Sequence, residues 1–304
     1  MRIPISRTAS VRLLIAGGVL ISLFAGCVQL EERERELTFR PSRVAAGWFS
    51  GLPDGVREVY LPIGTAADAP KLDAWWWPAE RADAPAVLYL HGSRWNLTGQ
   101  LRRIEQLHKF GFAVFAIDYR GFGKSDGDLP SEQSVYADAL AAWQWLAKQQ
   151  PDPARRVIYG HSLGGAVAID LAARLSEEGA GAARGLIVES TFTTLADVAT
   201  AVAPDWIPVR LLLSQKFDSL EKIARVRMPV FIAHGASDHL IPPRFSSALF
   251  DAAHEPKKLL LVDGATHNNT MIVGASDYLA GLLDLFGLSL DGPPHTPVAY
   301  DSPR

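Results

Sequence analysis

The sequence contains a single cysteine, Cys27, among its 304 residues. One thiol excludes an intramolecular disulfide and a zinc site built from cysteines. Positive charge is also in short supply, because 30 Lys and Arg residues face 33 Asp and Glu residues and the net charge is −3. The chain has no strongly basic field to gather phosphates, so we do not expect nucleic acid as a partner.

Apolar material for a folded core is plentiful. Hydrophobic residues make up 48% of the chain and charged residues 21%, proportions that are typical of globular proteins. The length suits one large domain, and neither an internal repeat nor a low-complexity tract divides it.

The first thirty residues have the pattern of an export signal. Three arginines, Arg2, Arg7 and Arg12, precede an apolar and uncharged segment, 13–24, and small residues follow it. A positive start, an apolar centre and a small-residue end are the features of a cleavable signal.

Residues 23–27, Leu-Phe-Ala-Gly-Cys, resemble the lipobox of bacterial lipoproteins, with Phe24 where Leu is usual. The resemblance implies that Cys27 is acylated and becomes the mature N-terminus of an exported, membrane-anchored lipoprotein of the bacterial cell envelope. The alternative is a single uncleaved transmembrane anchor, because residues 13–30 carry no charge and are just long enough to span a bilayer. Both interpretations attach the chain to a membrane by its N-terminus.

These features predict the domain organisation. An export signal covers 1–26, a membrane-proximal linker 27–54 and an enzyme-sized domain 55–287, and a loosely ordered, Pro-bearing tail covers 288–304. The charged run at 31–36 within the linker is interpreted as a solvated spacer.

The domain alternates between short apolar runs and helical patterns. Such alternation indicates an α/β fold with a mostly parallel central sheet and helices on both faces. Ser131 is placed to cap one of the helices. The expected strands are 56–63, 71–77, 86–90, 113–117, 157–159, 186–188, 230–233 and 259–262, and the expected helices include 101–109, 131–149, 165–175 and 272–286.

The interval 191–227 is longer than an ordinary connection in such folds. We interpret it as a small helical cap inserted over one end of the sheet. Its apolar residues either pack against the domain or line a substrate site. They are Leu195, Val198, Val202, Trp206, Ile207, Leu211, Leu212 and Leu213.

Residues 160–164, Gly-His-Ser-Leu-Gly, fit the nucleophile pattern Gly-x-Ser-x-Gly. An expected strand ends just before them and a helix begins just after, which is the strand-turn-helix setting of a nucleophile elbow. Bulkier side chains at Gly160 and Gly164 would collide with neighbouring backbone in so tight a turn. We therefore predict that Ser162 is a catalytic nucleophile.

A serine hydroxyl needs an imidazole to take its proton, and the imidazole needs a carboxylate to orient it. Asp238 follows the expected strand 230–233, and His267 follows the strand 259–262. Both positions fall at the carboxyl edge of the sheet, and the order Ser, Asp, His is that of α/β-hydrolase sites.

Glu189 follows the strand next to that of the nucleophile and remains an alternative carboxylate. His91 and His234 end strands and are interpreted as structural, whereas His161 occupies the variable position of the motif. His239 is expected to be a surface or pocket residue.

An oxyanion hole is expected from two backbone N–H groups. One belongs to Leu163, directly after the nucleophile. The other belongs to the loop after strand 86–90, where we favour Ser93.

Several stretches resemble the α/β-hydrolase superfamily, and within it the Bem46-like serine hydrolases, over roughly residues 56–286. They are Tyr89–Gly92, Asp118–Ser125, Gly160–Gly165, Glu189–Phe192 and His234–Asp238. The resemblance implies a serine hydrolase in which residues 118–123 form a structural loop near the site. The family often has Asn where this chain has Ser93.

The expected function is hydrolysis of a small-molecule carboxylic ester or thioester through an acyl-enzyme intermediate, which requires no cofactor and no metal. A lysophospholipase or an amidase of the same fold is the alternative enzyme. The alternative from another class is a non-catalytic surface-binding lipoprotein. The sequence does not indicate the oligomeric state.

Overall fold

The computed structural model describes residues 28–288, apart from 65, 67, 82, 180–182, 205 and 207. The predicted signal, the proposed lipidation site Cys27 and nearly all of the predicted tail lie outside the described residues. No helix in the described part of the chain is both long and apolar enough to cross a bilayer.

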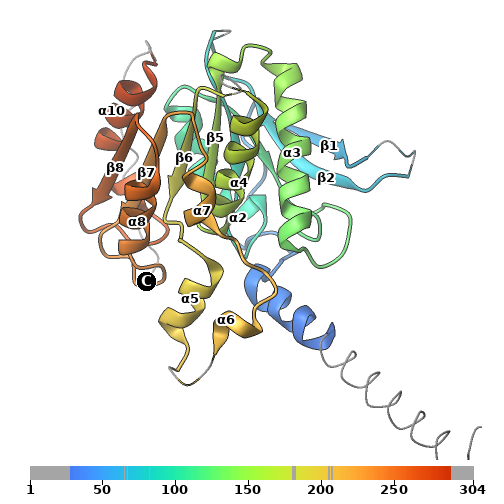
Figure 1. Ribbon diagram of the computed structural model, residues 1–304. Coiled ribbons are helices and arrows are strands. Elements are labelled where there is room, and N and C mark those ends of the chain that lie inside the picture. The colour runs from blue at the N-terminus through green and yellow to red at the C-terminus, as the bar shows by residue number, and fades with distance from the viewer. Residues whose placement is uncertain are drawn as a thin grey trace, which may run out of the picture.

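An eight-stranded sheet in the order β1-β2-β4-β3-β5-β6-β7-β8 forms the centre of the molecule (Figure 1). β2 pairs antiparallel with β1 and β4, and the other neighbouring strands pair in parallel. The predicted mostly parallel sheet is therefore confirmed. The strands are β1 (Arg57–Pro62), β2 (Lys71–Trp77), β3 (Ala86–Leu90), β4 (Ala113–Ile117), β5 (Arg156–His161), β6 (Gly185–Glu189), β7 (Val230–Gly235) and β8 (Lys257–Val262).

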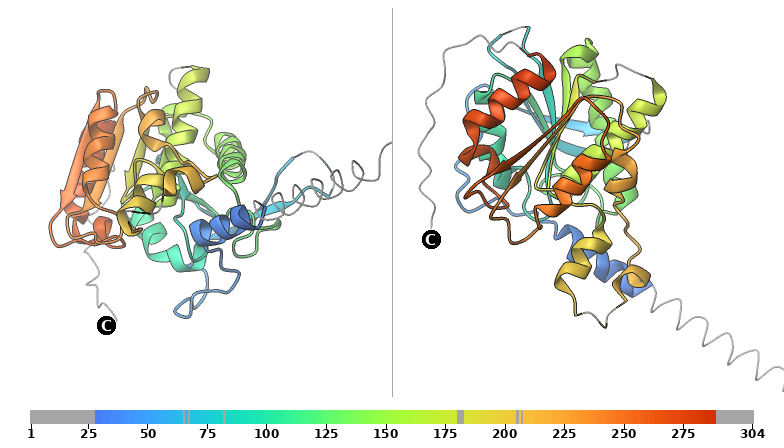
Figure 2. Two further views of the ribbon diagram at one scale, coloured as in Figure 1. Left: turned by 60° about the horizontal axis from the view of Figure 1, so that its bottom comes forward. Right: turned by 60° about the vertical axis from the view of Figure 1, so that its left-hand side comes forward.

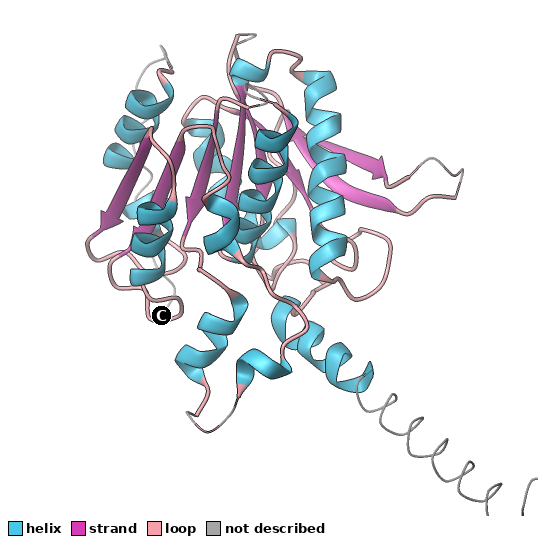
Figure 3. Cartoon of the chain, viewed as in Figure 1, coloured by secondary structure: helices cyan, strands magenta, loops and turns pink. Residues whose placement is uncertain are grey.

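Helices cover both faces of the sheet (Figure 3). Every residue of β3 and β4 is buried, because a parallel sheet covered on both faces exposes neither side of its central strands. One core contains side chains of α3 (Glu132–Gln149), α4 (Leu163–Glu178), α7 (Ser219–Ile223) and α8 (Arg244–Ala252), and the other contains side chains of α2 (Leu97–Lys109), α9 (Thr270–Val273) and α10 (Ala275–Phe286).

Helix boundaries agree with the sequence where a capping residue marks them. Ser131 caps α3 as predicted: its side chain accepts the N–H of Ser134, whose side chain accepts the N–H of Ser131. The predicted closing helix 272–286 is instead divided into α9 and α10. Gly274 separates them with φ −95° and ψ 24°, which are not the angles of an α-helix.

The predicted cap contains α5 (Leu195–Val202) and α6 (Val209–Leu212), which lie beyond the edge where the parallel strands end (Figure 1). Its apolar residues differ in exposure, and Leu213 is intermediate. Leu195 and Val198 pack against the core. The others that are strongly exposed are Val202, Trp206, Leu211 and Leu212, while Ile207 lies outside the described residues.

Residues 28–39 are helical and lie beside the cap in each view (Figures 1 and 2). The Glu34 carboxylate accepts the backbone N–H groups of Ser214 (2.7 Å) and Gln215 (2.8 Å). Arg35 Nε donates to the carbonyl oxygen of Pro130 at 2.8 Å. Two residues of the charged run that we expected to be solvated are thus docked on the domain, because their partners are backbone groups distant in sequence.

The end of the cap is held by Glu132, the first residue of α3. Its buried carboxylate accepts the backbone N–H groups of Lys216 (2.6 Å) and Phe217 (2.9 Å) and the hydroxyl of Tyr136 (2.8 Å). Removing the carboxylate would leave these donors unpaired in a buried place.

We therefore expect Glu132→Ala to lower the free energy of unfolding by about 1–3 kcal/mol. Chemical denaturation followed by circular dichroism measures this change. Glu177→Ala is the matched control, since Glu177 is exposed and pairs with Arg225 at the surface, and it should change the value by less than about 0.5 kcal/mol. Equal losses in the two variants would contradict the assigned role.

Candidate active site

Ser162 occupies the tight turn between β5 and α4. Its φ of 55° and ψ of −122° lie in a region that residues with a β-carbon rarely adopt. The Ser162 N–H donates to the carbonyl of Glu189 at 2.9 Å, and the Thr191 hydroxyl donates to the carbonyl of Ser162 at 2.8 Å. These bonds to the last residue of β6 and to Thr191 just after it hold the serine in its strained conformation.

Two glycines make the turn possible. A β-carbon at position 160 would overlap the carbonyl oxygen of Gly164, and one at position 164 would overlap the carbonyl oxygen of Leu90. The expected collision of larger side chains with backbone at both positions is therefore present in the fold. The serine is brought to the start of α4, whose N-terminal end favours negative charge.

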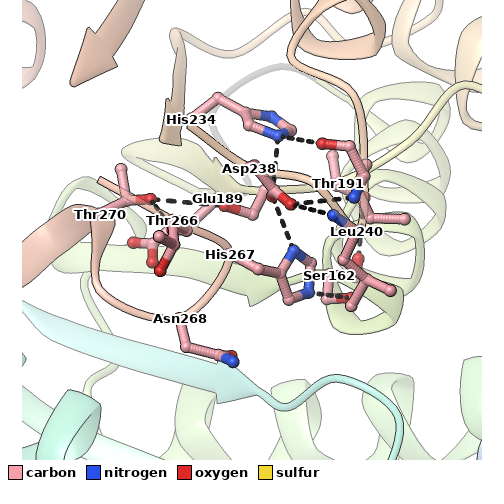
Figure 4. A network of polar contacts seen from close by, with 12 residues as sticks. Ser162, Glu189, Thr191, His234, Asp238, Leu240, Thr266, His267, Asn268 and Thr270 are labelled. Atoms are coloured by element: carbon pink, nitrogen blue, oxygen red, sulfur yellow. Dashed lines mark hydrogen bonds and ion pairs between the residues drawn. The ribbon is translucent and has the colours of Figure 1, made fainter. Parts of the chain in front are cut away.

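The structure brings the three predicted catalytic side chains together in one line (Figure 4). His267 Nε2 lies 3.1 Å from Ser162 Oγ, and His267 Nδ1 lies 2.8 Å from Asp238 Oδ2. Asp238 follows β7 and His267 follows β8, so all three arise at the carboxyl edge of the sheet. This is the geometry that general-base activation of a serine requires.

Asp238 is built to remain a carboxylate. Its Oδ1 accepts the backbone N–H groups of Leu240 (2.8 Å) and Ile241 (2.9 Å), and its Oδ2 contacts both His267 and His234. Burial opposes ionisation, but the hydrogen bonds from His234, His267 and Ile241 outweigh it and hold the pKa of Asp238 well below its ordinary value. The residue is thus ionised near neutral pH.

His234 lies directly behind Asp238. Its Nε2 is 2.9 Å from the carbonyl oxygen of Ile241 and 3.1 Å from Asp238 Oδ2, while its Nδ1 is 2.6 Å from Ser246 Oγ. Because a carbonyl only accepts, Nε2 carries a proton. His234 therefore orients the carboxylate, a role more specific than the structural one expected from the sequence.

The alternative carboxylate, Glu189, is not brought to His267. Its side chain is fully buried, with Oε2 accepting the hydroxyl of Tyr159 at 3.1 Å and Oε1 lying 3.5 Å from Arg103 Nε. Asp238 already occupies Nδ1 of the imidazole. The geometry therefore favours Asp238 as the orienting carboxylate.

The loop that carries His267 is held by two residues that the sequence analysis did not assign to the site. Arg103, on α2, donates to the carbonyl of Asn268 at 2.9 Å, and His161 Nε2 lies 2.9 Å from the carbonyl of His267. Burial lowers the pKa of His161 far below its ordinary value, and the nearby charge of Arg103 adds to this effect. The same His161 Nε2 lies 3.1 Å from Arg103 Nη2, so the two residues that hold the loop also contact each other. No motif marks Arg103, so only the fold identifies it.

The two expected oxyanion donors lie on segments that touch. The N–H of Leu163, at the first position of α4, has no partner within its helix. A β-carbon on Gly92 would lie 3.0 Å from the β-carbon of Ser162, so the loop that carries Ser93 contacts the elbow. The N-terminal segment holds this loop, because the Arg94 N–H donates to the carbonyl of Phe39 at 2.9 Å.

Comparisons with known proteins agree with this geometry. The Hydrolase_4 family model, described as serine aminopeptidase, S33, matches residues 82–221. Over 258 residues the chain is 35% identical to an uncharacterized protein of Mycobacterium tuberculosis, a match that covers 84% of this chain and 85% of the relative. The chain belongs to the α/β-hydrolase superfamily. The match to the family model includes Ser162 but ends before Asp238 and His267.

Two further proteins are similar over most of the hydrolase domain. Lysophosphatidylserine lipase ABHD12 of Danio rerio is 33% identical over 214 residues, which are 66% of this chain and 55% of that protein. The esterase Pf2001 of Pyrococcus furiosus has a TM-score of 0.62 and 22% identity, covering 82% of this chain and 97% of that structure. The fold predicted from the sequence, an α/β-hydrolase fold, is thus confirmed.

A cavity of about 220 Å³ lies at the β2 end of the same sheet edge, lined by Asp73, Trp75, Asp118 and Lys124 among others. The residues that line it do not include Ser162, Asp238 or His267. Burial raises the pKa of Asp73 to about 7, and the negative charges of Asp118 and Glu58 contribute to the rise. The α/β-hydrolase domain therefore contains a buried carboxyl that titrates near neutral pH apart from the candidate site.

Replacing His234 tests its role in positioning Asp238. We expect His234→Ala to lower kcat about tenfold, the effect of losing one hydrogen bond to a charged group, and to leave KM nearly unchanged because no substrate contact is lost. Steady-state kinetics on a soluble ester, with circular dichroism to verify folding, measures the effect. His239→Ala is the matched control at a neighbouring exposed histidine. A change in KM without a change in kcat, or an equal fall of kcat in the control, would rule out the positioning role.

The raised pKa of Asp73 predicts how stability depends on pH. Between its ordinary value of 3.8 and about 7, the folded chain holds a proton that the unfolded chain has released. Stability from this group is therefore present at low pH and is lost as pH rises through 7. Between pH 5 and 8 we expect the wild-type free energy of unfolding to fall by about 1–3 kcal/mol more than that of Asp73→Asn.

Urea denaturation at the two pH values, with Asp251→Asn as an exposed-carboxylate control, measures this difference. If Asp73→Asn keeps the wild-type dependence on pH, the assignment to Asp73 is incorrect.

Proposed function

We propose that this protein is a serine esterase or thioesterase that works through Ser162, His267 and Asp238. The observation that carries the proposal is the unbroken line of hydrogen-bond distances from Asp238 Oδ2 through the imidazole to Ser162 Oγ, 2.8 Å and then 3.1 Å. Membership of a hydrolase superfamily supports the same chemistry. A binding protein without activity would have no need of a strained serine aligned with a base.

In the first half of the proposed reaction, Ser162 Oγ attacks the acyl carbonyl while His267 Nε2 takes its proton. The ionised Asp238 stabilises the imidazolium that forms. The negative oxygen of the tetrahedral intermediate is received by the N–H groups of Leu163 and Ser93. His267 then gives the proton to the leaving alcohol or thiol, and the acyl group stays on the serine.

In the second half, water attacks the acyl-serine while His267 takes a proton from the water. The intermediate collapses, the proton returns to Ser162 Oγ, and the carboxylic acid leaves. Every proton is carried by residues of this chain. The proposed mechanism therefore requires neither a metal nor an organic cofactor.

A lysophospholipase activity is the second candidate, favoured by the similarity to a relative that is named a lysophosphatidylserine lipase. The proposed acylation of Cys27 supports it as well, because an anchored enzyme meets lipid substrates at the membrane. Comparison of esters, thioesters and amides that share one acyl group, followed by a series of chain lengths, distinguishes these activities from that of an amidase.

Replacing the nucleophile tests the proposal. We expect Ser162→Ala to lower ester turnover by at least about a thousandfold and to abolish labelling by a fluorophosphonate probe, since the attacking oxygen is gone. Ser176→Ala, on the same helix but away from the site, serves as the matched control and should keep both. Labelling is read from intact-protein mass spectrometry. Undiminished turnover in folded Ser162→Ala would refute the mechanism.

A further inference from the structure

Large apolar side chains are strongly exposed on two neighbouring elements, the cap and the helix 28–39. On the cap, Trp206 is 82% exposed and Leu211 is 85% exposed. A monomeric soluble surface rarely concentrates such side chains without a partner. We define the apolar end as the following exposed residues of these elements: Val28, Leu30, Leu37, Val202, Trp206, Leu211 and Leu212.

The cap leaves these apolar groups uncovered, and its charged side chains pair with each other between α5 and α6. Asp197 of α5 accepts the hydroxyl of Thr193 at 2.6 Å and pairs with Arg210 of α6 at 2.5 Å. Asp197 thus finds its partners within the cap, while the side chain of Arg210 stays 65% exposed, and Trp206 and Leu211 contact mainly solvent. This amphipathic division is typical of elements that lie in a membrane interface.

The apolar end lies on the side of the molecule where the candidate site opens. The parallel strands point with their carboxyl ends toward α5 and α6 (Figures 1 and 3), and Ser162, Asp238 and His267 arise at those ends. A surface that covers the apolar end would therefore lie close to the entrance of the site.

The course of the chain favours a membrane as that surface. The described chain begins at Val28, immediately after Cys27 and the uncharged apolar segment 13–24. The helix 28–39 is about 18 Å long at 1.5 Å per residue. The bonds from Glu34 to Ser214 and Gln215 tie it to the end of the cap. The membrane attachment predicted for the N-terminus would therefore bring the cap close to the same membrane.

We propose that the apolar end inserts into the interfacial region of a lipid bilayer, so that the site takes acyl esters from amphiphiles resident in that bilayer. Trp206 suits this place, since tryptophan is enriched where hydrocarbon meets water. The proposed docking is inferred from the exposed apolar side chains and from the course of the chain. The substrate class rests also on the serine esterase function proposed above. The competing outcome is that a second copy of the chain binds the apolar end.

Fluorescence quenching tests the docking without reference to activity. The full chain is reconstituted into phosphatidylcholine vesicles whose acyl chains carry bromine, which quenches nearby tryptophan. We expect bromine to quench a larger fraction of the tryptophan emission of the wild type than of Trp206→Phe, because the variant lacks the side chain that enters the bilayer. Vesicles without bromine give the reference emission of each protein. Equal quenching in wild type and Trp206→Phe would overturn the proposal.

Kinetics tests the substrate class. We expect the double variant Trp206→Ser with Leu211→Ser to lower hydrolysis of palmitoyl lysophosphatidylcholine in vesicles about tenfold, because two side chains no longer enter the interface. Hydrolysis of soluble p-nitrophenyl butyrate should not change. Tyr60→Ser is the matched control, since Tyr60 is 49% exposed on β1, away from the cap.

The outcomes separate the two proposals. Equal rates for the double variant and wild type on the vesicle substrate would overturn the substrate class. A soluble ester that is cleaved equally well by Ser162→Ala would instead refute the serine mechanism and leave the quenching result standing. Sedimentation in detergent identifies the competitor: a wild-type dimer that the double variant converts to a monomer, without bromine quenching, would assign the apolar end to a second copy.

Discussion

The hydrogen bond between Asp238 and His267 is the interaction on which the candidate site depends. It fixes which ring nitrogen faces Ser162, and without that orientation the serine hydroxyl has no acceptor for its proton. The bond is itself supported from behind, because His234 and two backbone N–H groups hold the carboxylate in its charged form. Much of the polar structure at this edge of the sheet thus serves to keep one acid ionised in a buried place.

The sheet explains how residues so distant in the sequence meet. Parallel strands end at a common edge, and β5, β6, β7 and β8 are consecutive neighbours, so the residues following them are close in space whatever their separation along the chain. Arg103, on α2, donates a further hydrogen bond to the carbonyl of Asn268 in the loop that carries His267. The position of His267 relative to Ser162 is therefore set by elements on both sides of the site.

Most of the fold could be predicted because buried parallel strands leave continuous apolar runs, and Ser131 could be identified because a capping residue acts on its own helix. The elbow and its partners follow a local motif and a chain order. Other features depend on contacts between distant segments, which no local pattern records. The docking of Glu34 depends on backbone 180 residues away, the break at Gly274 on the path of the chain after β8, and the place of His234 on the turn at Ile241.

The helix 28–39 has a consequence for where the chain can be shortened. Its Glu34 carboxylate accepts the N–H of Gln215, where the chain leaves the cap. Its Phe39 carbonyl accepts the N–H of Arg94, the residue after Ser93, whose own N–H is the proposed oxyanion donor. Cleavage of the chain after this helix would leave a domain without the hydrogen bonds that hold Gln215 and Arg94. The helix 28–39 is in this sense part of the hydrolase fold, and a fragment that begins after it would not be equivalent to the longer chain.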